Sequence, residues 1–245
     1  MNDYEKNPIV YGIEDHVMYV RINRPDMKNC LDWRDSAVLA QAYSEASANE
    51  DVRAIVVTGT GEYFHTGGRL NTYEPEEKAK FSEALRTRNE IIANFKVPLI
   101  VAVNGVCTGG GMSLLLHADL AIAAESATFG YPEILRGSFP VMSMVGSMSV
   151  LPKKKALEAF YFGEPLSPEE ALQCGLINRI VPDDQLMDKA REFAQKIVSQ
   201  PKELITIGRR AYHTLAQLPP NERKAYGMEV LQEILVAQQK YEKNV

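Results

Sequence analysis

The 245-residue sequence predicts an α/β fold, and three observations support this prediction. Up to about residue 182, short runs of β-branched and apolar residues alternate with longer amphipathic stretches, a pattern typical of α/β proteins. Beyond that point the apolar residues recur at helical spacing only. With 45% hydrophobic and 24% charged residues, the chain can bury a substantial core. We therefore expect a core domain over residues 1–182 and a helical region over residues 183–245.

The expected strands are short β-branched or apolar runs next to turn residues. They are VMYVRIN (17–23), AIVVTG (54–59), PLIVAVNG (98–105), DLAIAA (119–124) and GLINRIV (175–181). The expected helices cover residues 32–49, 78–95 and 111–117, and residues 184–199, 202–217 and 221–242 in the tail. A further helix starts at Ser167, because serine can cap, Pro168 suits the first helical position, and Glu170 completes a capping box.

The composition and charge exclude several functional classes. A net charge of −5 and a pI near 5.5 provide no positive field for a polyanion, so we expect no nucleic-acid partner. Cys30, Cys107 and Cys174 lie far apart, which argues against a disulfide framework or a zinc site and suits a reducing compartment. The polar N-terminal segment MNDYEKNP predicts no secretory signal. We therefore expect a cytoplasmic protein without a bound metal ion.

Residues 97–124 are long and mostly apolar, as a membrane helix would also be. Four glycines within seven residues, followed by His117 and Asp119, disfavour that interpretation, because each interior glycine costs an isolated helix about 1 kcal/mol. A buried strand, a tight turn and a buried helix explain the same apolarity. We expect no membrane association from this segment.

The glycine turn NGVCTGGGM, residues 104–112, is the most informative feature of the sequence. Three consecutive glycines let a ligand approach the main chain closely, and a helix start leaves unpaired N–H groups, so this turn can bind an anion. A phosphate loop would need lysine where Gly111 stands, and a dinucleotide fingerprint would need glycine or alanine where Leu114 stands. A nucleophile elbow around Ser113 would need glycine in place of Leu115. Close packing of strand against helix would explain the glycines without any ligand.

Two further segments carry candidate chemistry. A second glycine turn, FHTGGRL at residues 64–70, follows the strand expected at 54–59, and two such turns can direct two backbone donors at one thioester enolate oxygen. Glu133 follows Pro132 among apolar neighbours, which predicts a partly buried carboxylate whose raised pKa suits a general base. A helix N-terminal charge would also explain this glutamate. His65 can supply a second acid–base group or point away from the site.

Five segments, in order, resemble the enoyl-CoA hydratase/isomerase (crotonase) superfamily. They are INRPDMKNCLD (22–32), FHTGGRL (64–70), AVNGVCTGGGM (102–112), DLAIAAESATFGYPEI (119–134) and SPEEALQCGLINRIVP (167–182). This resemblance implies a crotonase-like spiral of ββα repeats and a C-terminal α-helical trimerisation region. It also implies an acyl-CoA substrate, coenzyme A only as part of that substrate with no permanently bound cofactor, and a homotrimer or a hexamer built from trimers.

The resemblance also implies a role for each site residue. The two oxyanion donors fall on the backbone N–H groups of Gly68 and Gly110, and Glu133 is the catalytic carboxylate. Lys28 lies in the region near the coenzyme A moiety, and Cys30 takes the position whose backbone lies near the adenine. The full expected substrate-binding set is Lys28, Cys30, Thr66, Arg69, Leu70, Ser113 and Tyr131.

The chain departs from the family pattern at three places. Ser113 stands where a hydratase of this family has the first of its two glutamates, and serine cannot exchange a proton at neutral pH as a carboxylate does. Arg69 replaces an aspartate after the oxyanion residue. Residues 140–145, PVMSMV, replace a glycine-rich helix start beside the acyl pocket, so we expect a remodelled apolar acyl site.

With one carboxylate left, we expect double-bond isomerisation of an enoyl-CoA. Glu133 would remove an α-proton from a 3-enoyl thioester and return it at C4, while the oxyanion hole holds the dienolate. An atypical enoyl-CoA hydratase, and a CoA-thioester decarboxylase or C–C lyase, are the alternatives. A non-catalytic scaffold is disfavoured, because it has no need of a carboxylate beside an oxyanion hole.

Overall fold

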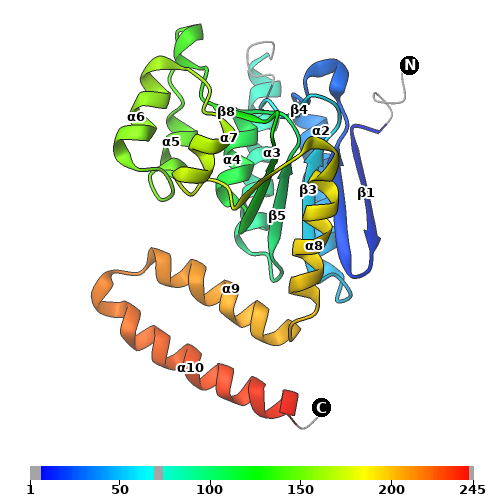
Figure 1. Ribbon diagram of the computed structural model, residues 1–245, viewed down its shortest axis with the longest axis vertical. Helices are drawn as coiled ribbons and strands as arrows, with labels where there is room; N and C mark the ends of the chain where they lie inside the picture. The colour runs from blue at the N-terminus through cyan, green and yellow to red at the C-terminus, as the bar shows by residue number, and fades with distance from the viewer. Residues whose placement is uncertain (1–6, 69–73, 243–245) are drawn as a thin grey trace.

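The computed structural model describes residues 7–68 and 74–242 of the chain (Figure 1). Within these residues the strands form one sheet in the order β1-β2-β3-β5-β7-β9 and a smaller sheet in the order β4-β6-β8. Neighbouring strands are parallel, except for the antiparallel pair β1 and β2. The larger sheet contains Ile9–Glu14 (β1), Val17–Ile22 (β2), Ala54–Gly59 (β3), Leu99–Val103 (β5), Leu120–Ala124 (β7) and Arg179–Val181 (β9), and the smaller sheet contains Tyr63–His65 (β4), Val106–Thr108 (β6) and Thr128–Gly130 (β8).

The larger sheet is buried on both faces. Every residue of β3 and β5 is buried, as parallel strands covered on both sides require. Ala190 and Ala194 of α8 pack against one face, and Leu39 and Tyr43 of α2 belong to the core on the other. The described helices are Trp33–Ala48 (α2), Pro75–Ala93 (α3), Gly110–His117 (α4), Val141–Ser147 (α5), Lys153–Phe162 (α6), Pro168–Gln173 (α7), Leu186–Val198 (α8), Lys202–Gln217 (α9) and Pro220–Glu242 (α10).

The α/β class predicted from the sequence is confirmed, with most expected elements within a few residues of their predicted bounds. The capping box of α7 is present, since Ser167 Oγ accepts from Glu170 N at 3.2 Å and Glu170 Oε2 accepts from Ser167 N at 2.9 Å. The strand expected from residue 175 is wrong in its start, because Gly175 adopts a φ of 79° and β9 begins only at Arg179. No helix among the described residues is long and apolar enough to cross a membrane.

The tail after β9 is helical, as predicted, and its helices pack in two different ways. Helix α8 lies on the sheet, whereas α9 and α10 form an antiparallel pair away from it (Figure 1). This pair has its own apolar cluster, which includes Ile207 and Val230. Several apolar side chains on α10 remain 43–55% exposed in this single chain: Met228, Leu231, Leu235 and Val236. The division at residue 182 and the oligomerisation role stay predictions.

Asp119 anchors α9 to the end of the larger sheet where the inner strands β5 and β7 begin. Its Oδ2 accepts from the backbone N–H of Leu99 at 2.7 Å and from Arg209 Nε at 2.8 Å. Its Oδ1 lies 2.8 Å from His213 Nε2. The Arg209 side chain is only 6% exposed, so Asp119 is the carboxylate that compensates a nearly buried guanidinium.

Replacing Asp119 with alanine is expected to lower the free energy of unfolding by roughly 3–5 kcal/mol, because the substitution leaves Arg209 buried and unpaired. Urea denaturation measures this change. The matched control is Asp188→Ala, since the Asp188 side chain is 81% exposed and pairs with Arg191 on the surface of α8. A loss of stability no larger than that of the control would contradict the anchoring role of Asp119.

Candidate active site

The smaller sheet brings the candidate residues together at one end of its strands. Its strands are parallel, with His65 of β4 opposite Cys107 of β6, and with β6 paired to β8 in the same direction. Ligands of parallel α/β sheets bind beyond the carboxyl ends of the strands. Gly68 follows β4, Gly110 follows β6 and Glu133 follows β8, each within three residues of the strand end. The three candidate catalytic residues therefore lie at the same end of the smaller sheet, beyond the carboxyl ends of its strands.

The two glycine turns are in contact with each other. Gly67 has a φ of 103°, and a Cβ at this position would lie 3.0 Å from Gly110 N. A Cβ at Gly68 would lie 2.1 Å from the Phe81 ring, and a Cβ at Gly111 would lie 2.1 Å from the carbonyl oxygen of His65. Close packing alone accounts for Gly111, whereas Gly68 and Gly110 also present backbone at the strand ends.

The N–H groups of Gly68 and Gly110 are available to a ligand. Neither donates a hydrogen bond within the part of the chain that the structure describes. Gly110 is the first residue of α4, where an α-helix leaves its N–H groups unpaired and carries partial positive charge. Two such donors can stabilise negative charge that develops on one oxygen.

Asn29 joins the loop before α2 to the first glycine turn, and sequence reasoning did not single it out. The side chain is fully buried, and its amide donates to the carbonyl oxygens of Tyr63 at 2.5 Å and Thr60 at 3.0 Å. Its own carbonyl oxygen lies 2.7 Å from His65 Nδ1. Asn29 also has a φ of 52°, a conformation that asparagine tolerates better than most residues. The sequence offers no local signal for this residue, because Lys28 and Asp32 make the surrounding segment polar as well.

His65 is a buried neutral side chain. Burial lowers its pKa to about 4, and the positive charge of Arg88 acts in the same direction, against the hydrogen bond to Asn29. Because a carbonyl oxygen can only accept, Nδ1 carries the proton, and the approach of Gly67 N to Nδ1 at 3.4 Å is not a hydrogen bond. The imidazole ring lies against Gly110, where a Cβ would be 2.9 Å from Nε2. At neutral pH His65 therefore supports the turn without a charge.

Glu133 has a partly buried carboxylate with one oxygen left unpaired among the described residues. Its Oε2 is buried and has no hydrogen-bond partner among the described residues. Burial raises the pKa of this carboxyl, while its own backbone N–H and Arg136 act in the opposite direction. Glu133 immediately precedes a 3-10 turn at Ile134–Arg136, but its side chain caps no helix. Glu133 thus stands at the N-terminus of a short helix, as the alternative interpretation expected, but its carboxylate makes no capping hydrogen bond there. A proton-accepting role fits the raised pKa.

The expected substrate-binding residues have different surroundings. Lys28 is exposed, Cys30 is half-buried, and Thr66 Oγ1 donates to the carbonyl oxygen of Lys28 at 2.8 Å, so all three belong to one loop cluster. Arg69 and Leu70 lie outside the described residues.

Ser113 and Tyr131 differ in their access to a ligand. Ser113 is half-buried on α4, one turn after Gly110. Tyr131 is fully buried, its hydroxyl lies 2.6 Å from Ser147 Oγ, and its ring packs on Phe160. The position of Tyr131 favours a packing role, and a direct contact of Tyr131 with substrate stays a prediction.

The helix expected beside the acyl site is α5. Met142 is 80% exposed in this single chain, whereas Met144 packs partly against the main core. Phe139, just before α5, is 37% exposed. This segment therefore presents apolar surface, and its role in an acyl site stays a prediction.

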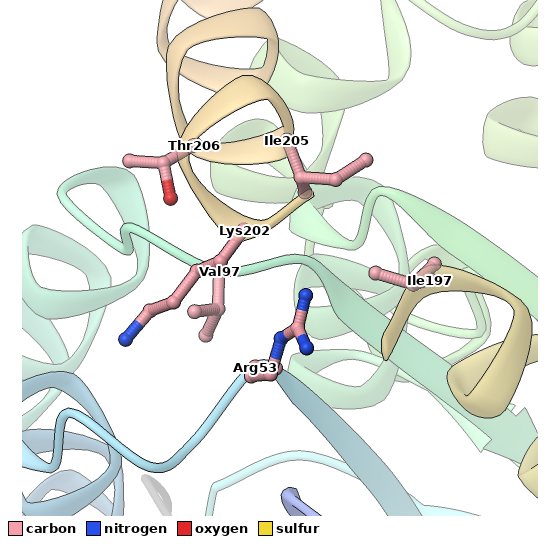
Figure 2. Close-up of a pocket in the computed structure, with 6 residues that line it drawn as sticks. All are labelled: Arg53, Val97, Ile197, Lys202, Ile205 and Thr206. Carbon is pink, nitrogen blue, oxygen red and sulfur yellow. The ribbon is translucent and has the colours of Figure 1, made fainter. Parts of the chain in front are cut away.

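A crevice drawn in Figure 2 lies elsewhere, where β3 and β5 begin. Its lining is Arg53, Val97, Ile197, Lys202, Ile205 and Thr206. Arg53 donates to the carbonyl oxygen of Gln200, and Lys202 Nζ lies 3.2 Å from Glu50 Oε2, so both side chains already have hydrogen-bond partners. The described residues contain no group of histidine, cysteine, aspartate and glutamate side chains that could hold a metal ion.

Known proteins similar to this chain act on coenzyme A thioesters, according to their names. The family model for enoyl-CoA hydratase/isomerase matches residues 12–245. The (E)-benzylidenesuccinyl-CoA hydratase of Thauera aromatica is 34% identical over 196 residues, which cover 78% of this chain and 77% of the relative. The mevalonyl-coenzyme A hydratase of Aspergillus fumigatus is 30% identical over 85% of this chain and 81% of the relative.

Solved structures agree with this assignment. An enoyl-CoA hydratase subunit of Geobacillus kaustophilus superposes with a TM-score of 0.88 at 28% identity, covering 96% of this chain and 93% of that one. An enoyl-CoA hydratase/isomerase of Mycobacterium paratuberculosis superposes with a TM-score of 0.87 at 29% identity, covering 94% and 91%. This agreement confirms the crotonase fold inferred from the five sequence segments. The chain therefore belongs to the enoyl-CoA hydratase/isomerase family.

Proposed function

We propose that this protein isomerises the double bond of an enoyl-CoA thioester, with Glu133 as the only acid–base group. The observation that carries the proposal is the state of this carboxylate: Oε2 is buried without a partner among the described residues, and burial raises its pKa. Ser113 occupies the position of the second glutamate of a two-glutamate hydratase, and a hydroxyl cannot replace that acid. One carboxylate is sufficient for a 1,3-proton transfer.

The proposed reaction uses the three strand-end positions together. The thioester oxygen accepts hydrogen bonds from the N–H groups of Gly68 and Gly110. Glu133 removes a proton from C2, and the electrons of that C–H bond delocalise onto the thioester oxygen as a dienolate. The same carboxyl then returns the proton at C4. Each oxyanion donor contributes about 3–4 kcal/mol to transition-state stabilisation, judged from the removal of such donors in other enzymes.

Hydration is the second candidate, and the names of the relatives favour it. Besides the two hydratases above, the carnitinyl-CoA dehydratase of Salmonella paratyphi A is 31% identical over 86% of this chain. An atypical hydratase would need Ser113 to position the water that a second carboxylate would otherwise activate. The two reactions differ in their products, because only hydration adds the mass of water.

We also propose how coenzyme A and neighbouring subunits bind. The exposed Lys28 and the backbone of Cys30 lie on the loop tied to the first glycine turn, where they can contact the coenzyme A part of the substrate. No permanently bound cofactor is needed for this chemistry. The exposed apolar side chains of α10 support assembly into a trimer, or a hexamer built from trimers.

Product analysis with 3-hexenoyl-CoA and 2-hexenoyl-CoA distinguishes the two reactions. We expect the wild-type protein to interconvert the two thioesters in deuterated water, with deuterium appearing in the product, and to form little 3-hydroxyhexanoyl-CoA. Ser113→Glu supplies the missing acid and is expected to raise the yield of the hydrated product. Mass spectrometry measures both products.

Rapid hydration of 2-hexenoyl-CoA by the wild-type protein, without conversion of 3-hexenoyl-CoA, would exclude the isomerase. Ser113→Ala serves as the matched control, since it changes the same position without adding a carboxylate. If Ser113→Ala leaves isomerisation intact, Ser113 has no part in the proton transfer, as we propose.

A further inference from the structure

Arg88 is a buried guanidinium in the middle of α3. The residue is only 2% exposed, and burial lowers the pKa of its side chain. An arginine nevertheless stays protonated in proteins, so Arg88 carries a positive charge inside the fold. Buried charges are normally paired and hydrogen-bonded, because an isolated one is strongly unfavourable. The groups around Arg88 therefore show whether its charge has a partner in the protein.

The described residues give Arg88 no carboxylate partner. No ion pair within 4.0 Å includes it, and its hydrogen bonds go to the neighbouring Asn89 Oδ1, from Nη2 at 3.2 Å and from Nε at 3.4 Å. Tyr43 lies close enough for its phenol to be influenced by the charge of Arg88. The Tyr43 hydroxyl is itself buried without a hydrogen-bond partner. Among the described residues Arg88 thus has only a neutral amide oxygen as acceptor and the Tyr43 hydroxyl has none, so that one anion could serve both.

The position of Arg88 relates this pair of donors to the candidate active site. Phe81, two helical turns before Arg88 on the same buried face of α3, packs against Gly68. Long helical side chains lean toward the helix N-terminus, which for Arg88 is the direction of Phe81. The charge of Arg88 also influences His65, whose ring lies against Gly110. Arg88 therefore lies on the face of α3 that packs against the first glycine turn.

We propose that Arg88, assisted by Tyr43, binds a carboxylate on the acyl group of the substrate. The substrates would then be coenzyme A monothioesters of dicarboxylic acids. This inference rests on the proposed function only in assuming an acyl-CoA ligand at Gly68 and Gly110. A planar guanidinium suits a carboxylate because it can donate two parallel hydrogen bonds, and the Tyr43 hydroxyl can donate a third. An uncharged acyl chain would leave the Arg88 charge without a counter-ion among the described residues and the Tyr43 hydroxyl without an acceptor.

Binding measurements with matched ligands test the proposal without requiring turnover. The probes are succinyl-CoA, glutaryl-CoA and adipyl-CoA, each compared with the thioester whose terminal carboxylate is replaced by a carboxamide. We expect the full-length protein to prefer at least one of the acids over its amide by roughly 10–100-fold in Kd, the range for a hydrogen bond to a buried charge. Arg88→Met should remove this preference and leave amide binding almost unchanged.

Two further variants complete the test. Arg86→Met is the matched control, since Arg86 is exposed on the same helix, pairs with Glu83 and Glu90, and should not affect the preference. Tyr43→Phe removes only the second donor and is expected to reduce the preference several-fold, on the scale of one hydrogen bond. It also tests the proposal if Arg88→Met does not fold.

The stability of Arg88→Met provides an independent readout. Without ligand, this variant should unfold at the same or a higher temperature than the wild type, because an apolar side chain replaces an unpaired buried charge. The proposal is overturned if no acid binds more tightly than its amide, or if Arg88→Met weakens acid and amide equally. A protein that shows the preference but isomerises nothing would refute the proposed reaction and leave the Arg88 site intact.

Discussion

Glu133→Gln is expected to abolish proton exchange at the carbon next to the thioester while leaving coenzyme A binding nearly intact. Glutamine has almost the same shape as glutamate but cannot accept a proton at neutral pH, and loss of a general base typically costs about 10²–10⁴-fold in rate. The measurement is deuterium incorporation into butyryl-CoA, which lacks the double bond and so reports the first proton transfer alone. Binding of coenzyme A is measured by calorimetry on the same samples.

The control for this variant is Glu125→Gln. Glu125 is exposed directly after β7 and lies outside the three strand ends that form the candidate site. Its substitution should leave deuterium exchange unchanged. Exchange that persists in Glu133→Gln at the wild-type rate would show that another group is the base.

The pH dependence follows from the raised pKa of Glu133. The carboxyl must be ionised to accept a proton, so the rate should rise as pH increases through this pKa, which lies above the ordinary value of 4.5. The effect on stability has the opposite sign. Because the folded state holds this proton more tightly than the unfolded chain does, protonation of Glu133 stabilises the fold. This stabilisation is fully present below the pKa of the unfolded chain and is lost as pH rises through the pKa of the folded state. Glu133→Gln should remove both effects.

The long elements of the fold could be predicted because their patterns extend over many residues. Every residue of β3 is buried, so its apolar run is continuous and its bounds were predicted correctly. The strands of the smaller sheet are three residues long, and a single buried side chain such as Phe64 or Phe129 has no periodicity to detect. The sheet that positions the candidate site was thus the part that local patterns could not predict.

The buried polar residues around the site show a similar limit. The α3 sequence is rich in charge, and local propensity does not tell which arginine faces the core. Spacing does contain a signal, because Arg88 falls on the face defined by Phe81 and Ile92, whereas Arg86 does not. A charged residue on an apolar face is a contradiction between local pattern and global fold, and such contradictions concentrate at functional sites.

Gly110→Pro is expected to lose about 10²–10³-fold in the rate of α-proton exchange relative to Gly110→Ala, because proline lacks the N–H that we assign to the oxyanion hole. The comparison is possible because Gly110 is the first residue of α4, and the first helical position accepts proline. Both substitutions add a Cβ, which would lie 2.9 Å from His65 Nε2 and 3.0 Å from Gly67 Cα. The crowding they share therefore cancels in the ratio of their rates.

The two variants distinguish a catalytic N–H from a glycine that serves packing alone. If Gly110 were required only for close approach of the two turns, alanine and proline would slow deuterium exchange in butyryl-CoA to a similar extent, and both would lower the melting temperature. If the N–H stabilises the enolate, Gly110→Pro should exchange the α-proton about 10²–10³-fold more slowly than Gly110→Ala. The two variants should bind coenzyme A with similar affinity. If the two variants exchange deuterium at equal rates, the N–H of Gly110 does not stabilise the enolate, and Gly68 remains as the one assigned backbone donor. A single donor would not form the two-donor oxyanion hole that we propose. The glycine turn would then be explained by packing, as Gly111 already is.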